Sequence, residues 1–226
     1  MKILIIEDEI DLADSIENYL SKEGHLCESA NNYESALEKI HVYEYDCILV
    51  DITLPDGNGL SIVKKLKELH SNVAIIIISA KNSIHDKVNG LDIGADDYLA
   101  KPFHLSELNS RIKSVLRRVA FNGQNEFVYG EIKIQPDARF VYVNGNHVTL
   151  TPKEYDLLLY LIMNKNRVLT KEAIVEHLWG DYLGIGADSL DCVYTHVRNL
   201  RKKIMEHSDT DYIKTIYAVG YKFTLS

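Results

Sequence analysis

The sequence contains no long hydrophobic segment and few cysteines. No apolar run approaches the roughly eighteen residues that a membrane-spanning helix needs. The first residues, MKILIIEDE, lack the basic start and small-residue cleavage site of a signal peptide. The three cysteines, Cys27, Cys47 and Cys192, are an odd number without metal-ligand spacing. We therefore expect reduced cysteines in a cytoplasmic protein that has no membrane partner.

The chain also lacks an overall positive charge, since its net charge is −8. The two halves differ, however. Residues 1–120 carry 13 basic and 20 acidic side chains, whereas residues 121–226 carry 12 and 13. Part of the positive charge of the second half is concentrated in one predicted helix, at Arg198, Arg201, Lys202 and Lys203. Because DNA binding requires a local basic surface rather than a basic average, the composition does not exclude it.

The length of 226 residues fits two domains better than one. In the first half, five short apolar runs alternate with five amphipathic stretches. The runs are 2–6, 26–30, 46–50, 73–78 and 97–100, and the stretches lie near 11–22, 34–42, 58–70, 84–93 and 105–118. Several of the runs show no polar alternation, as expected for strands buried on both faces. This pattern predicts an α/β domain over residues 1–118, a flavodoxin-like (βα)5 parallel sheet with helices on both faces.

The second half has a different organisation. The stretch VAFNGQNE has no apolar periodicity and predicts a linker over 119–126. Short alternating strands follow, with a hairpin signal at Asn144-Gly145. Three predicted helices come next, and the first has a capping box formed by Thr151 and Glu154. The chain ends in a predicted hairpin, so we expect an α+β winged helix-turn-helix domain over 127–226.

Acidic and polar residues follow four of the apolar runs. Glu7 and Asp8 follow KILII, Asp51 follows CILV, Ser79 follows VAIIII, and Lys101 follows DDYLA. In an open α/β sheet these strand ends form the ligand crevice. Three carboxylates there repel one another unless a lysine or a divalent cation such as Mg²⁺ neutralises them. We therefore predict a site that accepts a phosphoryl group on Asp51.

Each residue has an ordinary alternative role. Glu7 and Asp8 could form a solvated turn and Asp51 could cap a helix, but these alternatives do not explain why the charges end the apolar strands. Pro55-Asp56-Gly57 is interpreted as turn chemistry without a role beyond shape.

Residues 1–118 resemble the receiver domain of a bacterial two-component response regulator. The resemblance implies that a histidine kinase phosphorylates Asp51, that Lys101 pairs with it, and that the Ser79 hydroxyl binds the phosphoryl group. It further implies that Tyr98 rotates inward as Ser79 moves, a two-state switch. A cis Lys101-Pro102 bond is also implied. The implied Mg²⁺ ligands are Glu7, Asp8, Asp51 and the backbone carbonyl of Thr53.

Charged residues between 85 and 118 resemble those that pair across a two-fold dimer in the OmpR/PhoB-like subfamily. A solvated face is the ordinary alternative, since exposed pairs contribute little each. Two-fold symmetry would repeat every pair and fix the register. Phosphorylation would then shift an existing equilibrium. The implied pairs are Lys87 with Glu107, Asp97 with Arg111, Asp96 with Arg118, and Asp92 with Lys113.

The predicted helix 190–204 has apolar residues at spacings of three and four on one side and polar residues on the other. The segments LTPKEYDLL, VYTHVRNLRKK and IKTIYAVGYKF resemble the OmpR/PhoB-like effector domain, over about 127–225. The resemblance implies that this helix enters the DNA major groove. Thr195 and Asn199 are the candidates for base contacts. The expected core positions are Leu190, Val193, Val197, Leu200 and Ile204, the expected phosphate contacts are His196, Arg198, Arg201 and Lys202, and the wing contributes Thr215 and Tyr217.

Two residues depart from this family pattern. Asp191 and Tyr217 stand where many members have basic residues that contact DNA, which leaves the affinity and the contact made by the wing open. The loop 182–186 corresponds to one that can touch RNA polymerase. Cys192, near the recognition surface, is interpreted as a small apolar residue, with a redox sensor as the alternative.

The sequence thus predicts a phosphorylation-controlled, DNA-binding transcription regulator that dimerises and binds tandem half-sites. Its only expected catalysis is the phosphorylation and hydrolysis of Asp51. One alternative is a phosphorylation-independent regulator whose receiver only dimerises. A nucleotide-binding or phosphatase-like enzyme is the other, but no G-x-G-x-x-G follows the first strand, and no P-loop or second aspartate two residues past Asp51 is present.

Overall fold

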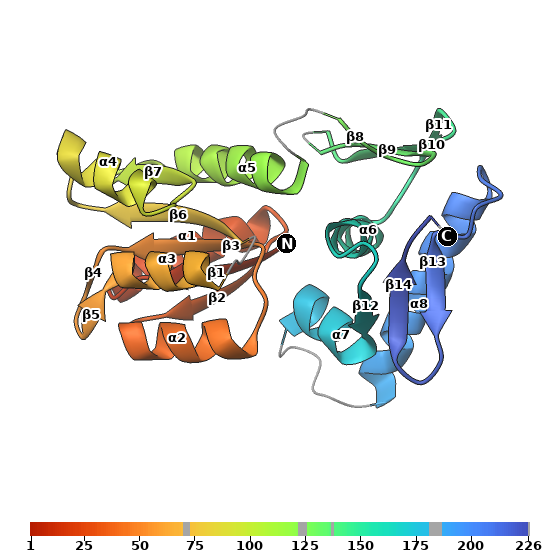
Figure 1. The fold of residues 1–226 in the computed structure, drawn as a ribbon, viewed down its shortest axis with the longest axis horizontal. Helices are drawn as coiled ribbons and strands as arrows, with labels where there is room; N and C mark the ends of the chain where they lie inside the picture. Colours follow the sequence, from red (N-terminus) through yellow and green to blue (C-terminus); the bar gives the residue numbers. More distant parts are fainter. Residues whose placement is uncertain (70–72, 122–125, 137, 181–186, 226) are drawn as a thin grey trace. The chain divides into compact units, whose positions relative to one another are not determined.

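The structure is a computed structural model that describes residues 1–69, 73–121, 126–136, 138–180 and 187–225, and side chains in 120–121 and 187–190 are not described. The chain forms two compact units, residues 1–123 and 124–226 (Figure 1). In the described residues, no helix is both long and apolar enough to cross a bilayer.

The first unit is built around one five-stranded parallel sheet with the order β2-β1-β3-β6-β7. All neighbouring strands pair in parallel, as predicted. The order reverses direction at β1, which is the arrangement of a doubly wound fold. The strands are β1 Lys2–Ile6, β2 Leu26–Ala30, β3 Cys47–Asp51, β6 Ala74–Ser79 and β7 Asp97–Ala100.

Helices cover both faces of this sheet and create two separate cores. One core contains side chains of α2 and α3, and the other contains side chains of α1 and α5. The isoleucines of β6 alternate between them, because Ile75 and Ile77 join the first core while Ile76 and Ile78 join the second. The helices are α1 Ile10–Lys22, α2 Tyr33–Val42, α3 Gly59–Glu68, α4 Ile84–Asp92 and α5 Leu105–Phe121.

Helix α5 continues to Phe121 instead of ending at 118. No helix-breaking residue occurs before Gly123, and Val119 still packs against the second core. Helical propensity and burial therefore extend the helix into the segment that was predicted as linker.

A short hairpin, β4 Thr53–Leu54 with β5 Gly57–Asn58, follows β3 and was not predicted. Asp56 at its turn accepts hydrogen bonds from the backbone N–H groups of Tyr33 and Glu34, at 2.6 and 3.0 Å. These bonds attach the hairpin to the N-terminus of α2, where unpaired N–H groups favour a carboxylate. Asp56 is thus a turn residue, as predicted, and it makes a structural contact with α2 that was not predicted.

The second unit begins with a four-stranded antiparallel sheet, order β11-β10-β9-β8. Asn144 and Gly145 both have positive φ, 49° and 79°, as the predicted two-residue hairpin requires. The buried face of this sheet includes Ile132, Ile134 and Val141. The strands are β8 Phe127–Tyr129, β9 Ile132–Gln135, β10 Phe140–Val143 and β11 Asn146–Val148.

Three helices and a three-stranded sheet of order β12-β14-β13 complete a winged helix-turn-helix domain. The capping box is confirmed, because Thr151 and Glu154 exchange backbone and side-chain hydrogen bonds at the start of α6. The third helix starts at Ala187, slightly before the predicted position. The elements are α6 Pro152–Met163, β12 Val168–Thr170, α7 Lys171–Trp179, α8 Ala187–Met205, β13 Ile213–Ile216 and β14 Gly220–Phe223.

Candidate phosphoacceptor site and nucleic-acid interface

The carboxyl ends of four strands of the parallel sheet carry the predicted site residues. Asp51 is the last residue of β3 and Ser79 the last of β6, while Glu7 and Lys101 directly follow β1 and β7. Strand β1 is the point at which the strand order reverses, so this is where an open α/β sheet forms its ligand crevice. The sheet therefore brings together residues that are separated by almost a hundred positions.

Lys101 bridges two of the carboxylates. Its Nζ lies 2.6 Å from Asp51 Oδ2 and 2.7 Å from Glu7 Oε1. Burial alone lowers the pKa of Lys101, but its hydrogen bonds and Coulomb attraction to Asp51 and Glu7 outweigh burial and raise the pKa above its usual value. Lys101 therefore supplies a positive charge beside Asp51.

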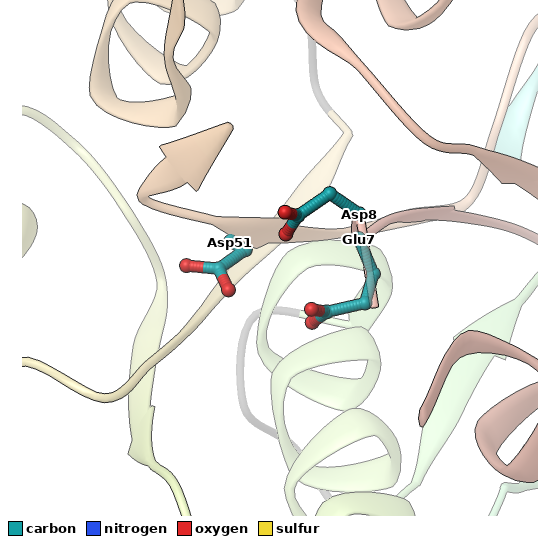
Figure 2. A group of neighbouring side chains, drawn as sticks. All are labelled: Glu7, Asp8 and Asp51. Atoms are coloured by element: carbon teal, nitrogen blue, oxygen red, sulfur yellow. The ribbon is translucent and has the colours of Figure 1, made fainter. Parts of the chain in front are cut away.

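One lysine does not balance three carboxylates. Glu7, Asp8 and Asp51 each offer an oxygen, and these oxygens lie within 4.8 Å of one another (Figure 2). Glu7 Oε2 is buried and has no hydrogen-bond partner. Burial raises the pKa of Glu7, hydrogen bonding and attraction to Lys101 lower it, and repulsion from Asp51 raises it, with a net upward shift. An unsatisfied buried oxygen in a cluster of carboxylates fits a hard divalent cation such as Mg²⁺.

The backbone around Asp51 is held in place from both sides. The N–H of Thr53 donates to Asp51 Oδ1 at 2.9 Å. A Cβ atom on Gly59 would lie 1.9 Å from the carbonyl oxygen of Asp51, so only glycine allows α3 to begin here. Sequence reasoning missed Gly59, although a glycine directly after the Asn58 cap of a predicted helix was a usable signal.

Ser79 and Tyr98 lie next to this cluster. Ser79 is completely buried, and its hydroxyl accepts from the Lys81 N–H at 3.2 Å. The Tyr98 side chain is turned inward, with 7% of its surface exposed, and its hydroxyl donates to the Lys81 carbonyl at 2.6 Å. Both residues are therefore bonded to the same segment after β6. The Lys101-Pro102 bond is cis, as the resemblance implied.

The polar side of α8 is exposed where DNA contact was predicted. Thr195, Arg198, Asn199 and Lys202 are exposed, as is Asp191. The opposite side is buried at Val193, Val197, Leu200 and Ile204, as predicted, whereas the Leu190 side chain lies outside the described residues.

Two residues that were expected to contact DNA phosphates, His196 and Arg201, make contacts within the protein instead. His196 is half-buried, and its ring lies 5.3 Å from that of Trp179, centroid to centroid. Burial lowers the pKa of His196, so it is poorly suited to carry charge to a phosphate. Arg201 donates to the Ile213 carbonyl and to Thr215 Oγ1 and pairs with Asp211, so its guanidinium fastens the wing to α8.

A hollow of about 420 Å³ lies between α8 and the wing. Lys171, at the start of α7, and the exposed Tyr194 line it, and neither was predicted as a site residue. Tyr217 forms its outer edge with 93% of its surface exposed. Residues from α7, α8 and the wing thus form one basic and aromatic surface.

Comparison with known proteins identifies both units. The family model for the response regulator receiver domain matches residues 3–113, and the model for transcriptional regulatory protein, C terminal, matches residues 145–223. The response regulator ArlR of Staphylococcus haemolyticus is 40% identical over 220 residues, which cover 97% of each protein. ArlR of Staphylococcus aureus is 39% identical over 221 residues, which cover 97% of this chain and 98% of that protein. The chain belongs to the OmpR/PhoB family of two-component response regulators.

A solved structure supports the receiver fold of this response regulator. The CheY-like receiver domain protein of Methanospirillum hungatei is 31% identical, with a TM-score of 0.52. The match covers 54% of this chain and 98% of the Methanospirillum protein. Membership in this family makes the chain a transcription regulator controlled through its receiver, rather than a conventional enzyme. It also implies a histidine kinase and DNA as partners.

The response regulator carries an apolar stripe on the face predicted to dimerise. Ile84, Val88 and Leu91 of α4 are 82%, 49% and 45% exposed, and their spacing places them on one side of the helix. Arg111 pairs with Asp97 at 2.9 Å and also with Glu107, and both pairs lie within one chain, whereas the Asp97 pair was expected across a dimer.

The other predicted dimer residues are also placed. Asp92 and Lys113 are exposed and Lys87 is half-buried. Lys113 lies 3.3 Å from Glu23, and Arg118 donates to the carbonyl of Asp96. The loop 182–186 lies outside the described residues.

Proposed function

We propose that a histidine kinase transfers a phosphoryl group to Asp51 and that this transfer increases the affinity of the regulator for DNA. The observation that carries the proposal is the position of Lys101 between Asp51 and Glu7, beside a buried carboxylate oxygen without a partner. In the transfer, an O–P bond forms at Asp51 while the P–N bond of the phosphohistidine breaks. Asp51 is held ready for this reaction by Lys101 and the Thr53 N–H.

Glu7, Asp8 and Asp51 would hold Mg²⁺, together with the backbone carbonyl of Thr53. The ion supplies charge neutralisation for the incoming phosphoryl oxygens when it is bound. Lys101 provides the other positive charge and remains next to the phosphoryl group after transfer. Hydrolysis of the product returns the site to its initial state, so catalysis is limited to the regulator's own aspartate.

The signal would leave the site through Ser79 and Tyr98. A phosphoryl group on Asp51 offers oxygens that accept a hydrogen bond from the Ser79 hydroxyl. Moving that hydroxyl removes its bond with the Lys81 N–H, so the segment after β6 can shift and favour the inward Tyr98 ring that is bonded to the same residue. The bond from Tyr98 to the Lys81 carbonyl stabilises the inward position. Phosphorylation thereby shifts an equilibrium between two packing arrangements.

Dimerisation through α4, β7 and α5 is the proposed response. The exposed Ile84, Val88 and Leu91 provide apolar surface that a second copy would bury. Most of the charged residues around it already have partners within one chain, so we assign the whole set the role of fixing the register. The set comprises Lys87, Asp92, Asp96, Asp97, Glu107, Arg111, Lys113 and Arg118.

The dimer would place two copies of α8 in adjacent major grooves. Thr195 and Asn199 reach base edges, and Arg198 and Lys202 contact phosphates. Tyr217 and Thr215 of the wing contact the sugar-phosphate backbone of the DNA that lies beside the hollow. Because its partner is DNA, we assign the regulator to the cytoplasm.

The test is selection of DNA from a random pool by the purified protein, with Mg²⁺ and with or without beryllofluoride, a phosphoryl mimic. We expect enrichment of two direct half-sites about one helical turn apart, stronger with the mimic. Asp51→Asn should bind DNA but lose the response to beryllofluoride. If Asp51→Asn and the unmodified protein regulate transcription equally in cells, the phosphorylation-independent alternative is correct.

A further inference from the structure

Helix α4 contains a glycine in its interior, Gly90, whose presence is explained neither by helix propensity nor by the backbone geometry of a turn. Gly90 has ordinary helical φ and lies within Ile84–Asp92. Glycine is unfavourable inside a helix relative to alanine, because it has more backbone freedom to lose. Gly90 is nevertheless buried, so the reason for it must come from what it packs against.

Gly90 packs against the switch tyrosine. A Cβ atom on Gly90 would lie 2.8 Å from Ile77 Cδ1 and 3.1 and 3.3 Å from two ring carbons of Tyr98. Ile77 and Tyr98 are direct neighbours in the pairing of β6 with β7. The bare glycine thus lies over an adjacent pair of side chains, one of which is the aromatic residue that is turned inward.

The two neighbours differ in how they can move. Ile77 is completely buried in the first core, so its Cδ1 can be displaced only into close-packed side chains. Tyr98 has an alternative, because rotation about its Cα–Cβ bond carries the ring out of the core. A methyl group at position 90 would therefore oppose the inward position of Tyr98 more than the outward one.

We propose that Gly90 is a positioning residue of the switch, which provides the space that the inward Tyr98 ring occupies. This inference rests on the proposed function, because it assumes that the inward ring accompanies activation. Gly90 touches neither the phosphoacceptor nor DNA. A substitution there should leave phosphorylation intact and reduce only its transmission.

The experiment compares full-length Gly90→Ala with the unmodified protein and with Asn89→Ala. Asn89 is the exposed neighbour on the same helix, so its replacement controls for helix propensity. Phosphorylation of Asp51 by a small phosphodonor should be unchanged in all three. The increase in DNA affinity caused by beryllofluoride should fall about tenfold in Gly90→Ala. A tenfold change corresponds to a moderate overpacking penalty on the conformation with the inward Tyr98 ring. Asn89→Ala should respond like the unmodified protein.

The position of the ring gives an independent readout. In protein that contains 3-fluorotyrosine, Tyr98→Phe assigns the ¹⁹F resonance of Tyr98. With beryllofluoride bound, this resonance should report a buried ring in the unmodified protein and a solvent-exposed ring in Gly90→Ala. A buried ring with a full DNA response in Gly90→Ala would overturn the proposal.

A second variant keeps the test valid if Gly90→Ala does not fold. In Gly90→Ala/Ile77→Val the closest contact disappears, because valine lacks Cδ1, whereas the ring contact at 3.1 Å remains. The switch should still be impaired in this variant. Full switching would show that the clash with Tyr98 is not the cause and would overturn the proposal. If the unmodified protein itself ignores beryllofluoride, the proposed function fails, and with it the premise of a switch that Gly90 serves.

Discussion

Replacement of Lys101 by methionine removes the only protein cation among the described residues that contacts both Asp51 and Glu7. The side chains of Glu7 and Asp51 are 2% and 7% exposed, and each lies within 2.7 Å of the ammonium group. Breaking a fully buried ion pair costs about 3–5 kcal/mol. Because Lys101 is 17% exposed and Asp8 is open to solvent, we expect a loss of about 2–4 kcal/mol in the free energy of unfolding of the receiver without Mg²⁺.

Mg²⁺ and acid should both reduce this loss. Mg²⁺ stabilises the folded state of both proteins, by about 2.7 kcal/mol at a hundred times its Kd, and the loss shrinks because the ion should bind more tightly once the competing ammonium group is gone. Burial already raises the pKa of Glu7, and loss of Lys101 removes the interactions that lower it. As the pH falls from neutral through the pKa of Glu7, one of the two buried charges is therefore neutralised. The difference from the unmodified protein should shrink over this range.

Urea unfolding measured in EDTA and in Mg²⁺ tests this prediction. Far-UV circular dichroism reports both units, whereas fluorescence reports the second unit, which contains the only tryptophan, Trp179. The fluorescence midpoint should not change. Lys64→Met is the matched control, because Lys64 is 72% exposed and lies 4.0 Å from Glu68. A Lys101→Met receiver as stable as the unmodified one in EDTA, or a deficit that Mg²⁺ leaves untouched, would refute the reasoning.

Three further outcomes are expected. Asp56→Ala should destabilise the receiver at neutral pH. Hydrogen bonds from backbone N–H groups hold the pKa of Asp56 below 3.8. The stability difference between the variant and the unmodified protein, followed by circular dichroism, should therefore vanish in strong acid. Since burial lowers the pKa of His196 below 6.5, acidification through this range should lower the Trp179 fluorescence midpoint, and His196→Leu should remove that dependence. Arg198→Ala should weaken binding to all DNA sequences and reduce the salt slope by about 1, whereas Asn199→Ala should relax base preference at one position.

The receiver strands could be predicted closely because both of their faces are buried. A continuous apolar run that is followed by a charged residue indicates closely where the strand ends. The limits of β1 and β7 match the predicted ones. The same reasoning found Glu7, Asp51, Ser79 and Lys101, since each lies at or directly after a strand end. What these residues contact depends on the strand order, β2-β1-β3-β6-β7, which the apolar runs alone do not determine.

Contacts between segments far apart in the chain were harder to predict. Asp56 looked like a turn residue because its partners, Tyr33 and Glu34, belong to another helix and carry no sequence signal that points to it. His196 lies at the border of the polar side of α8, where periodicity alone does not decide its direction. Trp179, at the end of the preceding helix, draws the ring inward.

The interior strand β6 has a consequence for the behaviour of the unfolded chain. Its sequence, AIIIIS, combines high β-propensity with no charge and no proline, which is the pattern of segments that assemble into intermolecular cross-β sheets. In the folded receiver it is paired with β3 and β7 and covered on both faces, so no other chain can reach it. A variant that destabilises the receiver exposes this segment, and the insoluble fraction recovered from cells then becomes a direct measure of how often the receiver opens.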